Sequence, residues 1–125
     1  METQTNFETV EIGTKESTKL EPANVKIVKV SIEPVGSKDA KKVQCEVKHP
    51  SSETLIKVSS AKIERKGKLE VGGLWFNLDD DNKIKKGSLL ASFLNFMQVK
   101  NVKELEGKQC QTVEDDSGYL VFKAY

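Results

Sequence analysis

The sequence predicts one β-rich domain with a single helix, folded as a small barrel. Short stretches of alternating apolar and polar residues, separated by polar turns, predict strands, and one run at residues 88–98 has apolar residues at helical spacing. The length of 125 residues suits one domain. Residues 1–23 are polar and acidic, and we expect a flexible tail there. Residues 24–125 then form the single globular domain.

The first half of this domain reads as three strands. In residues 25–32 the apolar positions are 25 and 27, then 28, 30 and 32, so the alternation slips by one residue at Ile27–Val28. Such a slip is typical of a β-bulge or of a strand that bends and contributes side chains to two faces. Residues 43–47 alternate regularly and predict a half-buried strand. A third strand is expected over residues 55–63.

A hairpin, a helix and a second hairpin are expected to follow. The glycine in Arg65-Lys-Gly-Lys68 suits a tight turn into a strand over residues 69–78, where Gly72-Gly73 marks a bulge or a sharp bend. Ser88 can cap a helix, and we expect its apolar residues to lie in the core. These residues are Leu89, Leu90, Phe93, Leu94, Phe96 and Met97. The last hairpin joins residues 109–114 to residues 119–125.

The resulting order is β-β-β-α-β-β. This is the serial order of an OB-like barrel, a five-stranded Greek-key barrel with a helix between its third and fourth strands. The slip at Ile27–Val28 agrees with it, because the first strand of such a barrel curves across both halves. An α+β roll with one packed helix is the alternative that the same order allows.

Composition limits the chemistry that this chain can perform. The net charge of +1 gives no signal for nucleic acid or membrane, and Arg65, the only arginine, weighs against bidentate recognition of bases or phosphates. No stretch has the length of a bilayer span, so we expect a cytoplasmic protein without membrane contact. Cys45 and Cys110 are too few for a zinc site and are expected to be buried, reduced thiols, with a disulfide as the alternative. We expect no metal and no other cofactor.

No catalytic motif is present, and we do not expect an enzyme. His49, the only histidine, precedes a proline in a turn and is expected at the surface, without a catalytic partner. The acidic run Asp79–Asn82 is followed by lysines rather than by the glycine and glutamate of a calcium loop, so a solvated turn is expected.

Binding of single-stranded nucleic acid is the function with support in the sequence. Such binding combines lysines that contact phosphate with aromatic side chains on which bases stack. Trp75 and Phe76 are adjacent in a predicted strand and point to opposite faces, and Phe76 is in phase with apolar neighbours, so Trp75 is expected outward. Packing of Trp75 against the tail or a second small core is the alternative. The candidate binding residues are Lys42, Lys48, Lys57, Trp75, Tyr119 and Lys123.

Three segments in the second half of the chain carry a resemblance. They are Gly73-Leu-Trp-Phe-Asn-Leu-Asp79, Lys86-Gly-Ser-Leu-Leu-Ala-Ser-Phe-Leu94 and Gly118-Tyr-Leu-Val-Phe-Lys-Ala-Tyr125. With Leu105-Glu-Gly-Lys108, their layout over residues 70–125 resembles small single-stranded-DNA-binding-type proteins of phages and archaea. The resemblance implies a role near replication or recombination and carries no functional residue across.

The alternative function is a protein-interaction module of a larger assembly, docked through a strand edge or the tail.

Overall fold

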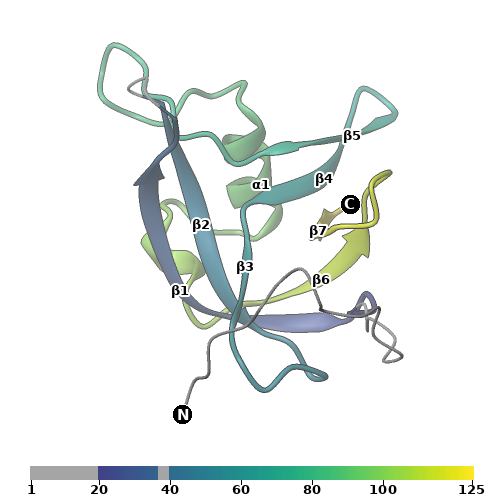
Figure 1. Ribbon diagram of the computed structural model, residues 1–125. Helices are drawn as coiled ribbons and strands as arrows, with labels where there is room; N and C mark the ends of the chain where they lie inside the picture. The colour runs from purple at the N-terminus through teal and green to yellow at the C-terminus, as the bar shows by residue number, and fades with distance from the viewer. Residues whose placement is uncertain (1–19, 37–39) are drawn as a thin grey trace, which may run out of the picture.

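The computed structural model describes residues 20–36 and 40–125, so the predicted tail lies outside the described residues except for its last four. Within these described residues, seven strands, one α-helix and one 3-10 helix follow one another (Figure 1). They are β1 (Asn24–Pro34), β2 (Lys41–Lys48), β3 (Ile56–Val58), β4 (Ser60–Arg65), β5 (Lys68–Gly73), α1 (Leu89–Phe96), η2 (Lys103–Leu105), β6 (Gln109–Glu114) and β7 (Leu120–Ala124).

The strands form one strongly curled, barrel-like sheet in the order β3-β2-β1-β6-β7-β4-β5. All neighbouring pairs are antiparallel except β4 and β7, which are parallel. β3 and β4 are separated only by Ser59, yet β3 pairs with β2 while β4 pairs with β7. One continuous stretch of chain therefore links two distant parts of the sheet. The predicted β-rich barrel-like fold with one helix is confirmed, and the β4–β5 hairpin extends its third strand.

β1 bends at the place where the alternation slips. Its register against β2 shifts between Ile27 and Lys29, which confirms the predicted bulge. Before the bulge, β1 pairs with β6 through residues 24–26. At the bulge, the N–H of Ile27 donates to the carbonyl of Lys108 over 2.8 Å, and Gly107 N–H donates to the carbonyl of Ile27 over 2.7 Å. Beyond it, β1 continues along β2 to Pro34 and has left β6.

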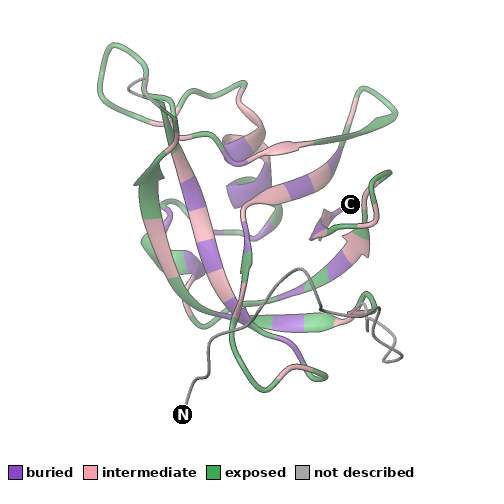
Figure 2. Ribbon diagram, in the orientation of Figure 1, coloured by how far each residue is buried: buried purple, intermediate pink, exposed green. Residues whose placement is uncertain are grey.

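The core lies between the curled sheet and α1, as the buried segments in Figure 2 show. Ser88 caps the helix by accepting a hydrogen bond from Ala91 N–H over 3.1 Å, as predicted. The ring of Phe93 stacks on that of Phe122 in β7, with the ring centroids 5.0 Å apart. The prediction for Phe96 was wrong, because its side chain is 47% exposed. Its position falls off the helix face that carries the buried residues 90, 93, 94 and 97.

Two strand boundaries also differ from the prediction. The strand expected over residues 69–78 ends at Gly73, and the chain beyond it is held by single contacts, such as Phe76 N–H to the carbonyl of Lys41 over 2.8 Å. The third strand is interrupted at Ser59, whose carbonyl accepts from Leu74 N–H over 2.9 Å. Gly72 marks close packing rather than a bulge, because a Cβ there would lie 2.8 Å from Leu89 Cδ1.

The prediction of a surface histidine was wrong. The His49 side chain is only 1% exposed. Its Nδ1 accepts the N–H of Ser51 over 3.0 Å, so the proton is on Nε2, which donates to the carbonyl of Glu21 over 2.7 Å. Thr112 holds the same segment, since its hydroxyl donates to the carbonyl of Ala23 over 2.7 Å. Buried polar groups need partners, and here the partners are the backbone groups of residues 21–23.

Cys45 and Cys110 are both buried and free. Burial raises the pKa of the Cys45 thiol from 9.0 to about 12, and the nearby Cys110 adds to the rise. Burial likewise raises the pKa of Cys110 to about 11. Both thiols are therefore protonated and unreactive in the folded protein at neutral pH.

We expect the two thiols to react only on unfolding. At pH 8 a disulfide reagent should modify neither thiol in native protein and both in urea. Between pH 9.0 and about pH 11, the thiols of the folded protein keep protons that the thiols of the unfolded protein lose. The free energy of unfolding should therefore fall as pH rises through this window. Urea titrations check this, and a Cys45→Ala/Cys110→Ala variant should lose less stability over the same range. Equal reactivity of native and unfolded protein would refute the prediction.

The two phenylalanines of α1 provide a matched pair for the packing of the core. Phe93→Ala removes a buried ring that stacks on Phe122 and should lower the free energy of unfolding by about 3–5 kcal/mol. Phe96→Ala makes the same chemical change on the exposed side of the helix and should cost under about 1 kcal/mol. Urea unfolding followed by circular dichroism measures both, and similar costs for the two variants would contradict this packing.

Candidate nucleic-acid interface

Alternation along β2 separates a core side from an outer side. Val43, Cys45 and Val47 are fully buried, and the residues between them point outward. Residues directly paired across neighbouring strands lie on the same side of a sheet, so the pairing extends this outer side to β1 and β3. We call the result the β1–β3 outer face. It comprises Lys26, Lys29, Ser31, Glu33, Lys42, Gln44, Glu46, Lys48 and Lys57.

The β1–β3 outer face is basic, with five lysines against two glutamates. Glu46 lies between Lys29 on one side and Lys57 on the other, so two positive charges flank it. Lys26 and Lys29 are absent from the residues predicted from the sequence. The slip in β1 was the signal that could have found them, because it places Lys29 outward once the bulge has shifted the register.

Lys42 and Trp75 meet at one end of the β1–β3 outer face. They form an isolated antiparallel bridge, and the Lys42 ammonium lies 5.2 Å from the centre of the indole ring, within the range of a cation–π contact. Trp75 is 39% exposed, as predicted, and its neighbour Phe76 packs against the core. Gly73 makes room for the pair, because a Cβ there would lie 2.7 Å from Lys42 Cε and 3.0 Å from Trp75 Nε1.

Lys57 lies toward the other end and shares a hollow with Tyr119. Both line a hollow of about 440 Å³ between β3 and the turn that joins β6 to β7. The carboxylate of Asp115 organises this turn by accepting hydrogen bonds from the N–H groups of Ser117 and Tyr119, over 2.8 and 2.9 Å. The turn leaves Tyr119 71% exposed, and Asp115 also lines the hollow. Lys57 and Tyr119 thus contribute a lysine and an exposed aromatic residue to the lining of one hollow.

The other two predicted residues are placed differently. Lys48 belongs to the β1–β3 outer face, but its ammonium donates to the carbonyl of Ser52 over 2.9 Å, in the turn that follows β2. Lys123 lies on β7 beside Lys62, outside this face. Its ammonium lies 4.3 Å from the centre of the Tyr125 ring. Of the six predicted residues, Lys42 therefore contacts Trp75, and Lys57 and Tyr119 line one hollow. Lys48 lies at the rim of the face, and Lys123 lies outside it.

The acidic run forms a hydrogen-bonded turn. The carboxylate of Asp79 accepts hydrogen bonds from Asp81 N–H over 2.8 Å and Lys83 N–H over 3.0 Å. These bonds lower the pKa of Asp79. Across residues 20–36 and 40–125, no group of three or more His, Cys, Asp or Glu side chains is placed to hold a metal ion. No helix in the described part of the chain is long and apolar enough to cross a membrane.

Comparison of the chain with protein-family models, curated proteins and solved structures finds no match. The likeness of residues 70–125 to small single-stranded-DNA-binding-type proteins therefore stays a prediction from layout. The geometry of the Lys42–Trp75 pair, and of the hollow that Lys57 and Tyr119 line, is what bears on function.

Gly73→Ala tests the packing of the Lys42–Trp75 pair. The added methyl group would displace the flexible end of Lys42 and crowd the indole. We expect the fluorescence of Trp75, the only tryptophan, to become more accessible to quenching by acrylamide, with little change in the free energy of unfolding. Gly87→Ala is the control, because a Cβ at Gly87 meets no atom within 4 Å. Unchanged quenching in Gly73→Ala would show that Lys42 does not cover the ring.

Proposed function

We propose that the protein is a non-catalytic module that binds single-stranded nucleic acid weakly and without sequence preference on the β1–β3 outer face. The observation that carries the proposal is the cation–π contact of Lys42 with Trp75 on a basic face, with Lys57 and the exposed Tyr119 lining one hollow toward its other end. Every base presents a flat aromatic surface, so stacking on Trp75 and Tyr119 would be sequence-tolerant. The lysines would contact phosphates as point charges.

The position of this face agrees with the proposal. In OB-folds the face of the second and third strands and the loops joining strands one and two and strands four and five bind oligonucleotides. Here the face lies on β2 and β3, and Tyr119 lies in the turn between the last two strands, β6 and β7. The proposal therefore includes a relationship to OB-fold proteins and, with it, a cytoplasmic role close to replication or recombination.

The charge of the face sets the expected strength. Glu33 and Glu46 lie among its five lysines, so only part of the positive charge is free to attract phosphate. Bidentate recognition by arginine is not available there, because Arg65 lies on β4 and its guanidinium pairs with Glu70 over 3.1 Å. Binding that is weak, salt-dependent and indifferent to sequence follows from these two features.

Quenching of Trp75 fluorescence by oligo-dT at low salt tests the proposal. We expect affinity to fall as salt rises, and Lys42→Met and Lys57→Met should each reduce the salt slope by about 0.7. Tyr119→Ala should weaken binding by about 1–3 kcal/mol through lost stacking. Tyr125→Ala and Lys68→Met, which alter residues outside the face, are the matched controls. Absence of quenching at low salt, or equal losses in the controls, would refute the assignment.

A further inference from the structure

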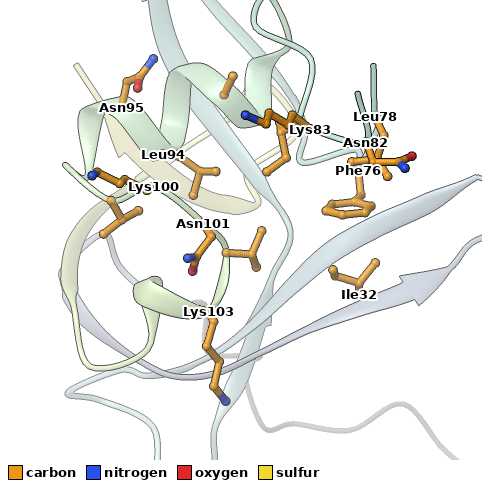
Figure 3. Close-up of a pocket in the computed structure, with 14 residues that line it drawn as sticks. Ile32, Phe76, Leu78, Asn82, Lys83, Leu94, Asn95, Lys100, Asn101 and Lys103 are labelled. Carbon is orange, nitrogen blue, oxygen red and sulfur yellow. The ribbon is translucent and has the colours of Figure 1, made fainter. Parts of the chain in front are cut away.

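A larger hollow of about 700 Å³ opens on a different side of the molecule. It lies between the end of β1, the segment 76–84, and α1 with the turn that follows it (Figure 3). We call it the α1 groove. Phe76 lines it, whereas the adjacent Trp75 is on the outer face. Ile32 lines it too, whereas Ser31 and Glu33 on either side belong to the β1–β3 outer face. The groove is therefore separate from the proposed nucleic-acid interface.

The floor of the α1 groove is apolar and open to solvent. Leu94, Val99 and Phe76 belong to the core or pack against it, and they form part of the lining. Ile32 and Leu78 also line the groove, and each leaves 40% of its surface exposed. Large apolar side chains gathered in a hollow of this size are typical of ligand-binding sites.

The polar part of the lining is made only of lysines and asparagines. No Asp or Glu is among the fourteen lining residues. Lys103 is paired with Glu106 over 2.9 Å, and Figure 3 shows its side chain extending away from the others. Lys83 and Lys100 make no salt bridge within the described residues. Asn82, Asn95 and Asn101 add side-chain amides, which both donate and accept hydrogen bonds.

We propose that the α1 groove binds a short acidic peptide that carries apolar side chains. The apolar floor takes the peptide's apolar side chains, and Lys83 and Lys100 attract its carboxylates. The asparagine amides match the N–H and C=O groups of an extended backbone. The lining disfavours a basic peptide, because its positive charges would face Lys83 and Lys100. The nearest acids, Asp79 and Glu104, do not line the groove and already accept hydrogen bonds from the backbone N–H groups of these two lysines, over 3.0 and 2.7 Å.

Binding to the full chain is measured with a fluorescein-labelled peptide, Asp-Leu-Glu-Phe-Asp-Leu, by anisotropy and by NMR shifts of the lining residues. One comparison peptide carries Lys at each acidic position, and another carries Ser at each apolar position. We expect saturable binding of the first peptide alone. Saturating oligo-dT should not displace it, because the nucleic-acid face lies elsewhere.

Charge-reversal variants assign the site. Lys83→Glu/Lys100→Glu should weaken binding by about tenfold or more, because both groove cations become anions. Lys85→Glu/Lys86→Glu makes the same charge change on exposed residues that do not line the groove, and it should leave affinity within about twofold. Failure of the acidic peptide to bind, or equal losses in both double variants, would overturn the proposal. Concentration-dependent shifts at the lining without peptide would assign the groove to a second copy of the chain and overturn it too.

Discussion

The bend of β1 at its bulge is the constraint on which the rest of the structure depends. β1 lies between β6 and β2 in the sheet order, and it pairs with β6 only as far as Lys26. The extra residue lets the strand turn away while Ile27 keeps hydrogen-bond partners for its N–H and its carbonyl. Without this turn the sheet would stay flatter. The end of β1 that leaves β6 is also the part whose Ile32 lines the α1 groove.

A second constraint is the passage from β3 to β4 through Ser59. The first half of this stretch, β3, pairs with β2, and the second half, β4, pairs with β7. Pairing with both strands keeps the sheet curled. α1 then covers the inside, where Phe93 meets Phe122. The inside is filled by the side chains of the core, and the α1 groove and the smaller hollow beside β3 open to solvent. The division between core and outer side on β2 thus decides where binding chemistry can lie.

The two proposed sites differ in chemistry because adjacent residues of the chain lie on different sides of the domain. Trp75 and Phe76 are consecutive, and one joins a lysine on the outer face while the other lines the α1 groove. The outer face offers the exposed ring of Trp75 beside Lys42, with Glu46 among its lysines, which suits an extended polyanion held loosely. The groove has an apolar floor and no acids in its lining, which suits a ligand that can bury large apolar side chains there. The two proposals thus place two different ligands on different sides of one domain.

The sequence by itself determined what depends on near neighbours. Alternation defined the strands and the bulge, helical spacing defined α1 and its Ser88 cap, and the phase of Trp75 placed it outward. Only the tertiary structure decided what depends on distant segments. His49 is buried because the backbone carbonyl of Glu21, far away in the chain, accepts a hydrogen bond from its ring. Phe96 is exposed because it lies off the helix face that packs into the core. The grouping of lysines on one face likewise follows from strand pairing, which brings together residues that no local pattern relates.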